Sequence, residues 1–500
     1  MKRIYITSIL CFLSMLIFLP GCDDGFDELN INPTQAPDLD PSFQLTFSQI
    51  SSTNNRYEWW RAQFIYCSTI IQHNASSFSY WSGDKYNEID SYSSALWDSS
   101  YPREIKNTVD LVNRTTPDVA PEHANFNAAA RIMKVYYFAR LTDTYGDLPY
   151  SEAGKGFIDL TYFPVYDTQQ SIYNDFFAEL DAAVNQFSDS ALPLSGDVWL
   201  GNDIDKWKKW ANSLKLRLGM RLSKVDAGLA QSMVSSAISG GVMETIEDMP
   251  VIFHTEMDRN GNTAVLQADD NFRLSDTFDS YLKETGDPRL PIWGMTYDAD
   301  GVPQPDVSTW KGLPNGTDGT SPEFDMLVEF VRHNRSTIKS VTAPMFIQGL
   351  AEVKFLQAEA AVRGWGSGNA ADLFAEGLRA GMQQANMYDN ASISEEDIEA
   401  FVAANALDES SSEASIEHIA TEQWVSTYLD AVEAFANWRR TGYPELTPVN
   451  HEIGTTGGTI PRRLYYPPSE LGVNPNFQEA IDRQFGGVND LTGRVWWDAQ

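Results

Sequence analysis

Apolar positions that recur every three to four residues predict long helices through the body of the chain. Such stripes run through residues 125–140, 172–187, 207–222, 345–363, 370–382 and 416–435. This spacing places the apolar side chains of each segment on one helix face, which must be buried against a partner. Gly364 stands where a helix ending at Arg363 would be capped, and Ser392-Ile393-Ser394-Glu395 has the spacing of a capping box. The pattern predicts an all-α fold, built partly from stacked helix pairs, with long loops between them.

The first 21 residues have a different pattern. Lys2 and Arg3 precede an apolar run over residues 4–19, and Pro20 and Gly21 then lead to Cys22. This pattern predicts a lipoprotein signal peptide over residues 1–21, with the lipid attached to the thiol of Cys22. The alternative is an ordinary signal peptide with an incidental cysteine. No later apolar run approaches the roughly 20 residues needed to cross a bilayer, so the lipid is the only predicted anchor.

A polar and acidic stretch follows Cys22 and has no helical period. We interpret residues 22–42 as a lipidated acidic tether that holds a folded body, residues 43–500, away from a membrane. An acidic segment directly after a lipidated cysteine resembles the surface-export signal of some Gram-negative bacteria. The sequence therefore predicts a lipid-anchored protein on the outer face of the outer membrane.

Composition narrows the classes of ligand. The chain has 36 basic and 69 acidic residues and a net charge of -33, which argues against nucleic-acid binding. Of its three cysteines, Cys11 leaves with the signal peptide and Cys22 carries the lipid, so that Cys67 has no partner for a disulfide. Cys67 lies in an aromatic run that looks helical, and we expect it to be a small buried apolar residue.

Aromatic rings occur in polar loops rich in Gly and Pro. Tyr80 and Trp81 lie in the segment 73–84, Trp293 lies in 289–297, and Trp310 begins 310–316. An aromatic ring on a loop can stack against the apolar face of a sugar while Asn and Asp side chains bind its hydroxyl groups. We predict ligand contacts at these four rings; the alternative is that they pin the loops to the core.

Catalytic and metal-binding patterns are missing from the sequence. The six histidines are scattered, and no zinc-protease motif, nucleophile elbow or phosphate-binding loop is present. Glu352 and Glu359 share a helix face, which a polar stripe or ion pairs between helices explain better than catalysis. The segments 256–261 and 298–301 hint at calcium loops but lack the full ligand set, so we expect turns. The sequence predicts no catalytic residue, no metal ligand and no cofactor.

A collinear set of short motifs resembles one family. It comprises Phe26-Asp27-Glu28-Leu29-Asn30-Ile31-Asn32-Pro33, Leu141-Thr142-Asp143-Thr144-Tyr145-Gly146-Asp147-Leu148-Pro149-Tyr150, Trp210-Ala211-Asn212-Ser213-Leu214-Lys215-Leu216-Arg217-Leu218, Asp287-Pro288-Arg289-Leu290-Pro291, Ala351-Glu352-Val353-Lys354-Phe355-Leu356-Gln357-Ala358-Glu359-Ala360, Trp438-Arg439-Arg440-Thr441-Gly442-Tyr443-Pro444, Arg462-Arg463-Leu464-Tyr465-Tyr466-Pro467-Pro468-Ser469-Glu470 and Trp496-Trp497-Asp498. In this order they look like the SusD/RagB lipoproteins, and most closely like the SusD-like branch.

This resemblance implies an all-α, SusD-like fold of tetratricopeptide-like helix pairs with long irregular loops. It also implies a cell-surface lipoprotein that binds a nutrient and delivers it to a SusC-like TonB-dependent β-barrel transporter. The cargo would be an oligosaccharide, with a peptide as the other option. Two different functions stay open: a surface glycoside hydrolase that uses two of the many carboxylates, and a helical scaffold for protein partners. We expect a binding protein rather than an enzyme.

Overall fold

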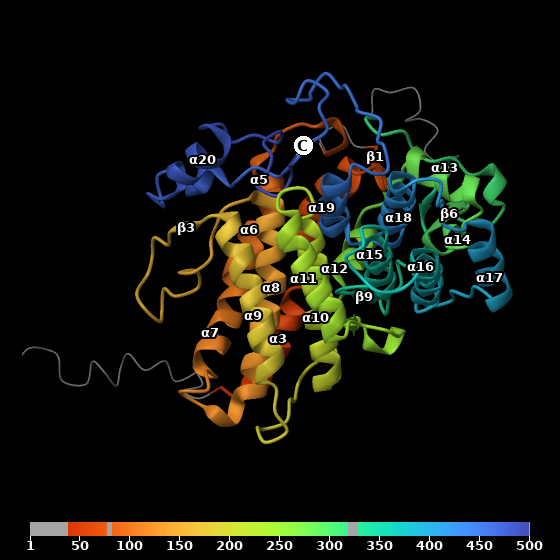
Figure 1. Ribbon diagram of the computed structural model, residues 1–500. Helices are drawn as coiled ribbons and strands as arrows, with labels where there is room; N and C mark the ends of the chain where they lie inside the picture. The colour runs from red at the N-terminus through yellow and green to blue at the C-terminus, as the bar shows by residue number, and fades with distance from the viewer. Residues whose placement is uncertain (1–38, 78–82, 319–328, 500) are drawn as a thin grey trace, which may run out of the picture. The chain divides into compact units, whose positions relative to one another are not determined.

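The computed structural model describes residues 39–77, 83–318 and 329–499, and the segment Pro41–Gln500 groups as one compact unit. Most of its regular structure is helical (Figure 1). The α-helices are α3 (Pro41–Ser51), α4 (Arg56–Glu58), α5 (Asp90–Ser93), α6 (Ala95–Ser100), α7 (Lys106–Arg114), α8 (Ala124–Tyr145), α9 (Gln169–Gln186), α10 (Ile204–Arg221), α11 (Ala227–Gly240), α12 (Gly261–Ala268), α13 (Asp276–Thr285), α14 (Leu290–Trp293), α15 (Leu350–Val362), α16 (Ala370–Ala385), α17 (Glu395–Ala404), α18 (Ser412–Ser426), α19 (Ala431–Thr441) and α20 (Phe477–Phe485). Within the described residues, no helix combines the length and apolarity needed to span a bilayer.

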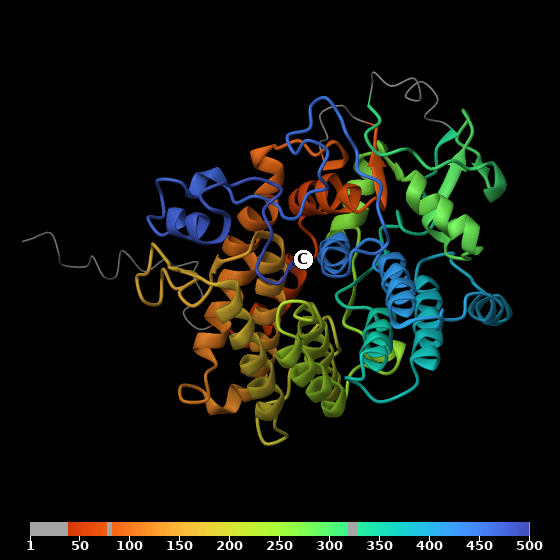
Figure 2. The same cartoon turned by 45° about the horizontal axis from the view of Figure 1, so that its top comes forward.

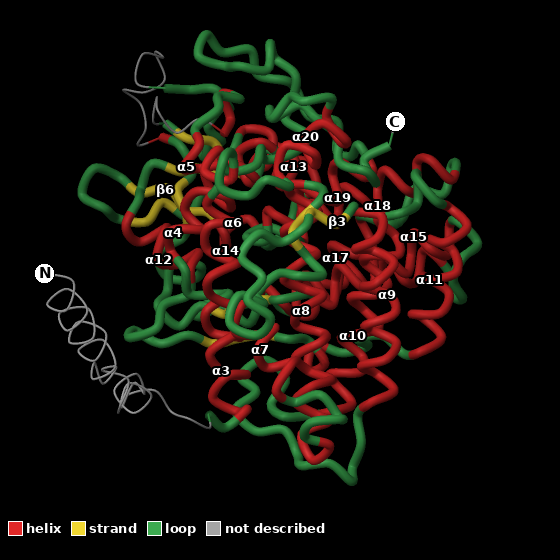
Figure 3. The backbone as a smooth tube through the Cα atoms, turned by 90° about the vertical axis from the view of Figure 1, so that its left-hand side faces the viewer, coloured by secondary structure: helices red, strands yellow, loops and turns green. Residues whose placement is uncertain are grey.

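The strands are short and lie among loops, as the tube in Figure 3 shows. They are β1 (Asn74–Ser76), β2 (Leu148–Pro149), β3 (Tyr166–Asp167), β4 (Val251–Phe253), β5 (Phe272–Leu274), β6 (Gly294–Tyr297), β7 (Pro303–Gln304), β8 (Arg332–His333) and β9 (Pro344–Phe346). All pairings between these strands are antiparallel: β1 with β5, β2 with β3, β4 with β9, and β6 with both β7 and β8. The strands therefore join loops rather than form a layer of their own.

Helices that follow one another in the chain pack as pairs (Figures 1 and 2). Helix α8 packs against α9, α10 against α11, and α15 against α16. Helix α10 also contacts α15, which joins the first set of helices to the second, and α18 lies between α15 and α19. The predicted all-α fold of tetratricopeptide-like helix pairs is confirmed. We call α8–α11 and α15–α19 the helical side of the molecule.

Most predicted helices match the structure closely. Helix α9 covers the stripe predicted over 172–187, α10 the stripe over 207–222, and α16 the stripe over 370–382. Gly364 follows the end of α15 with a φ of 71°, a left-handed conformation that glycine adopts without strain. Cys67 is fully buried in a π-helix, Trp59–Ser68, as expected for a small apolar residue.

Two predicted helices were wrong, and each misprediction has a local reason. The helix expected from Met345 starts at Leu350, because Pro344–Phe346 pairs as β9 with β4, about 90 residues earlier. The stripe over 416–435 forms two helices, α18 and α19, separated by a turn in which Leu429 has a φ of 73°. Left-handed φ is strained for a branched side chain such as leucine, so packing around this turn must hold it.

A third correction concerns a helix cap. The helix expected after Ser392 begins at Glu395, and its N-cap is Ser394. The Ser394 hydroxyl accepts the backbone N–H of Asp397 at 3.1 Å. The capping box predicted to open at Ser392 is therefore wrong, although the helix it was meant to announce is present.

Buried ion pairs cross the helix contacts of the helical side. Arg217 on α10 binds Glu352 on α15 through two hydrogen bonds of 2.6 and 2.5 Å. Arg440 on α19 binds Glu359 on α15 through two bonds of 2.7 Å. Burial of such pairs is tolerated only where the geometry satisfies both partners. The shared face of Glu352 and Glu359 is thus explained by ion pairs between helices, one of the two explanations predicted.

Candidate functional site

The loop segments singled out in the sequence come together on one side of the molecule. The segment 310–313 runs beside 330–331 and 274–276, with hydrogen bonds from Leu313 N–H to Leu274 O (2.9 Å) and from Val331 N–H to Lys311 O (2.9 Å). Strand β1 pairs with β5 beside them, and β8 pairs with β6. We call residues 73–77, 272–275, 294–318 and 329–335 the loop side of the molecule.

Asn and Asp side chains hold these loops to one another. The Asn315 side-chain amide donates to the carbonyl oxygens of Asn74 (2.9 Å) and Thr69 (3.2 Å). The Asp84 carboxylate accepts the backbone N–H groups of Ser76 (3.1 Å) and Gly316 (3.2 Å). Short side chains of this kind replace the hydrogen bonds of a sheet where the backbone is irregular. The described residues 73–77 and 83–84 of the first predicted segment are thereby fixed beside the second, 310–316.

The hairpin of β6 and β7 closes with the Asp298-Ala299-Asp300-Gly301 turn. The Asp298 carboxylate accepts the N–H groups of Asp300 (3.0 Å) and Val302 (2.8 Å), and Gly301 has a φ of 80°. Among the described residues, no group of three or more His, Cys, Asp or Glu side chains is arranged to hold a metal ion. The expected turn is confirmed, and the carboxylate that hinted at a calcium loop serves the turn itself.

A cavity of about 500 Å³ opens beside this hairpin. Its lining includes Tyr297, Asp298, Gln304, Lys311 and Glu329. The volume falls within the range of small-molecule sites, and the lining mixes one aromatic ring with several polar groups. Lys311 and Glu329 form an exposed ion pair of 2.7 Å across the cavity wall.

Tyr297 and Arg335 form an ordered aromatic and cationic pair beside this cavity. The Tyr297 hydroxyl accepts the Arg335 backbone N–H at 3.0 Å, and the guanidinium carbon lies 4.3 Å from the ring centroid. The Arg335 side chain is 44% exposed, so its remaining N–H donors face solvent. Tyr297 is only 5% exposed, so its ring and hydroxyl hold Arg335 in place, and the exposed part of the guanidinium offers donors to a hydroxylated ligand. The sequence did not predict the pairing of Tyr297 with Arg335. The only signal was the place of Tyr297 just before the Asp298–Gly301 turn.

Trp293 and Trp310 lie beneath this surface rather than on it. Trp293 is 5% exposed and stacks on Phe278, with ring centroids 5.8 Å apart. Trp310 is 3% exposed, and its indole N–H donates to the Gln304 carbonyl at 2.8 Å. The expectation that these rings are exposed is corrected, because the core fills the space around both. They support the loops, which is the alternative the sequence had left open.

Three other predicted residues lie outside the described part of the chain. These are Cys22, the predicted site of the lipid, and Tyr80 and Trp81, two of the predicted ligand contacts. The described residues on either side of the two aromatic positions, Ser77 and Gly83, belong to the loop side and to the short helix that follows it.

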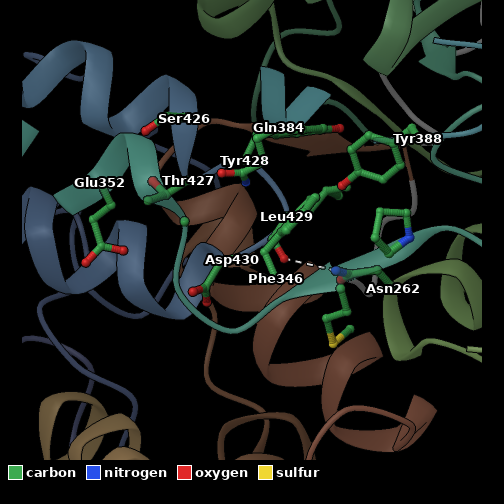
Figure 4. Close-up of a pocket in the computed structure, with 13 residues that line it drawn as sticks. Asn262, Phe346, Glu352, Gln384, Tyr388, Ser426, Thr427, Tyr428, Leu429 and Asp430 are labelled. Atoms are coloured by element: carbon green, nitrogen blue, oxygen red, sulfur yellow. Dashed lines mark hydrogen bonds between the residues drawn. The ribbon is translucent and has the colours of Figure 1, made fainter. Parts of the chain in front are cut away.

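A second, enclosed pocket lies between α12, α16 and the α18–α19 turn (Figure 4). Asn262, Tyr388 and Asp430 line it, and the Asn262 side-chain amide donates to the Leu429 carbonyl at 3.0 Å. Burial raises the pKa of the Asp430 carboxyl to about 6. The free space is about 30 Å³, which suits about two water molecules and not a sugar ring. This pocket therefore belongs to the polar core of the helical side.

Comparisons with known proteins agree with the fold and the family resemblance. A SusD-like family model, described as starch-binding and associating with the outer membrane, matches residues 33–467. A solved chitin-binding protein is 36% identical, with a TM-score of 0.83 over 92% of this chain and 100% of its own.

Two further structures are similar. A chitin-binding SusD homologue from Flavobacterium johnsoniae is 25% identical, with a TM-score of 0.79 over 92% of this chain and 98% of its own. A SusD homologue from Bacteroides uniformis is 25% identical, with a TM-score of 0.78 over 92% of this chain and 99% of its own. None of the curated proteins compared with the chain matches it.

Proposed function

Since this chain belongs to the SusD-like family of starch-binding proteins associated with the outer membrane, we propose that it captures an oligosaccharide at the cell surface without cleaving it. The observation that carries this proposal is the cavity of about 500 Å³ on the loop side, with Tyr297 and Arg335 fixed beside it. A site that binds and releases its ligand needs ready-made donors, which the exposed Arg335 and Lys311 side chains provide.

The ligand class to test first is a chitin-type oligosaccharide. Two similar structures carry chitin-binding names, and the first of them is 36% identical to this chain. Oligomers of N-acetylglucosamine present apolar ring faces, hydroxyl groups and amides. The exposed Arg335 and Lys311 side chains can donate to the hydroxyl and amide oxygens, and the buried Tyr297 ring holds Arg335 in place. Starch oligosaccharides form the second class, and peptide cargo the third.

We include Tyr80 and Trp81 in the proposed contact set on sequence grounds alone. Their segment is bounded by Ser77 and Gly83, and Ser77 N–H bonds the Asn271 carbonyl at 3.1 Å, next to β5. For Trp293 and Trp310 we propose a supporting role, in which the buried rings hold the strands that carry Tyr297 and Gln304.

The first test is affinity electrophoresis of the purified protein through gels containing chitin-type, starch-type and unrelated polysaccharides, with reducing-sugar release measured on the same panel. We expect retardation without product. A Tyr297→Ala and Arg335→Ala double variant should lose retardation, whereas Tyr162→Ala, an exposed tyrosine outside the loop side, should keep it. Product release would establish a glycoside hydrolase instead, and equal retardation of both variants would remove the proposed site.

We propose further that the protein is held to the outer membrane by a lipid on Cys22 and hands its cargo to a SusC-like TonB-dependent transporter. The feature of this chain that favours a protein partner is an exposed apolar loop between β2 and β3. In it, Phe157 is 86% exposed, Leu160 69%, Tyr162 67% and Phe163 57%. Contiguous exposed apolar groups of this kind mark interaction surfaces.

This apolar loop is ordered by contacts at both ends. The Asn476 side-chain amide donates to the Phe163 carbonyl at 3.1 Å, and the Lys106 ammonium lies 4.8 Å from the centre of the Phe157 ring. Replacement of Phe157 and Phe163 by serine should therefore reduce co-purification with the transporter in detergent and leave oligosaccharide binding unchanged. Unchanged co-purification would mean that another face docks.

A further inference from the structure

A second cavity with the chemistry of a sugar site lies at the C-terminal end of the described chain. It measures about 310 Å³, and its lining includes Thr168, Gln170, Arg483, Arg494 and Trp496. None of these residues belongs to the loop side. The cavity contains part of the closing Trp496-Trp497-Asp498 motif, which the proposed function does not use.

The two neighbouring tryptophans of this motif have different environments. Trp497 is fully buried, and its indole N–H donates to the Asp143 carboxylate at 2.8 Å. Trp496 is partly exposed and packs across Tyr173, with ring centroids 6.1 Å apart and planes at 61°. Among the described residues, no acceptor bonds the Trp496 indole N–H. Trp497 therefore anchors the segment, and the partly exposed Trp496 lines the cavity.

Few of the described tryptophans are exposed enough to contact a ligand. Of the tryptophans in the described residues, only Trp60, Trp365 and Trp496 are not classed with the buried core. Trp60 lies under the Arg56 and Arg61 guanidinium groups, and Trp365 lies under that of Arg363. Trp496, by contrast, lines the cavity of about 310 Å³.

The floor of the cavity is fixed by one carboxylate. Asp147 accepts two hydrogen bonds from Arg483, at 2.6 and 2.8 Å, and the Gln169 backbone N–H at 2.8 Å. The Gln484 side-chain oxygen in turn accepts the Asp147 N–H at 2.8 Å. The site is therefore preformed, so that a ligand need not order it on binding.

The charges at the cavity cancel across a network of three arginines and three carboxylates. Arg483 lies 2.6 Å from Asp147 and 3.7 Å from Glu479, while the Asp498 carboxylate is shared by Arg462 and Arg494. The Arg483 and Arg494 side chains remain 35% and 38% exposed, so N–H donors are left over for a ligand. Gln170 is exposed at the rim, and no described residue bonds its amide. A neutral, hydroxyl-rich ligand fits these donors better than an anion, because each guanidinium already contacts a carboxylate.

From this combination of ring, donors and cancelled charge, we propose that the Trp496 cavity is a second binding site for a neutral saccharide of one or two sugar units. The inference rests on the proposed function, from which it takes the class of ligand. Its residues are independent of the first site, because the two cavities share no lining residue. A second site would raise the retention of a long polysaccharide through bivalent binding.

The test is calorimetric titration of the purified protein with chitotriose. We expect two sites in the parent protein and one in Trp496→Ala, whereas Trp496→Phe, which keeps a ring, should retain two. Gln170→Ala, at an exposed position, should weaken the second site about tenfold without altering thermal unfolding. Trp365→Ala is the matched control, because it removes a partly exposed tryptophan that is not part of this cavity.

The loop-side double variant, Tyr297→Ala with Arg335→Ala, separates this inference from the proposed function. If it keeps one site that Trp496→Ala then removes, the second site is established. If it loses all binding while Trp496→Ala and Gln170→Ala match the parent, the second site is overturned and the proposed function stands. If the parent protein binds no saccharide at all, both fail.

Discussion

The helical side and the loop side of this protein are stabilised in different ways. On the helical side, apolar stripes and charged pairs such as Arg217 with Glu352 and Arg440 with Glu359 fix helices against one another. On the loop side, short polar side chains such as Asn315 and Asp84 replace backbone pairing. The helical side therefore forms a frame of packed helices, while the loop side exposes polar groups and keeps Trp293 and Trp310 below the surface.

The largest expected effect comes from breaking a buried pair on the helical side. Glu359→Ala leaves the buried Arg440 guanidinium without its carboxylate, so the free energy of unfolding should fall by about 3–5 kcal/mol. Arg379→Ala breaks the pair with Glu399, whose side chains are 36% and 46% exposed, and should cost less than about 1 kcal/mol. Denaturant unfolding of the two variants checks this, and equal losses would contradict the contrast between buried and exposed pairs.

A smaller change in the free energy of unfolding should come from the pH-dependent protonation of Asp430. Burial raises the pKa of Asp430 from an ordinary 3.8 to about 6, so the folded state holds its proton more tightly than the unfolded state. Its stabilising contribution is therefore complete below about pH 4 and is lost as the pH rises through about 6.

Asp430→Asn removes this titration. The stability of the parent relative to the variant should fall by about 2 kcal/mol from pH 4 to pH 7, as measured by denaturant unfolding at each pH. A difference between parent and variant that does not change with pH would show that Asp430 titrates normally. The exposed Asp306→Asn variant serves as a control for the general effect of removing a carboxylate.

On the loop side, the loss of stability should be smaller than that caused by breaking a buried ion pair. Asn315→Ala removes two hydrogen bonds to backbone carbonyls and should cost about 1–2 kcal/mol in unfolding. Because the segment it holds lies beside the cavity, oligosaccharide affinity should fall about tenfold. Asn476→Ala also removes two bonds to carbonyls, at 3.1 and 3.2 Å, but away from the loop side, and should leave affinity unchanged. Equal affinity in both variants would mean that Asn315 does not order the binding site.

The sequence predicted the helical side better than the loop side for a physical reason. Helices such as α9 and α16 depend on local periodicity, which is visible in a single sequence. The start of α15 was wrong because β9 pairs with a distant strand, and the break at Leu429 depends on tertiary packing. Local patterns carry no information on such contacts.

The candidate site shows the same limit. The structure brings the segments 73–77, 289–297 and 310–316 together, but the predicted loop 289–297 is helix α14 followed by strand β6. Which face of a loop a ring occupies is decided by neighbours such as Phe278 and Gln304, so Trp293 and Trp310 were expected on the surface and are buried. Tyr297 was overlooked because its pairing with Arg335 joins positions 38 residues apart.

The most direct test of the account is hydrogen exchange of the parent protein with and without a chitin-type oligosaccharide. Binding at the loop side should slow exchange of the amides in 294–317 and 329–335 and leave α15–α19 unchanged. The second site would add protection near 168–170 and 494–497. Protection confined to the helical side, or none in the presence of saturating ligand, would contradict the claim that this protein binds saccharide through its loop side.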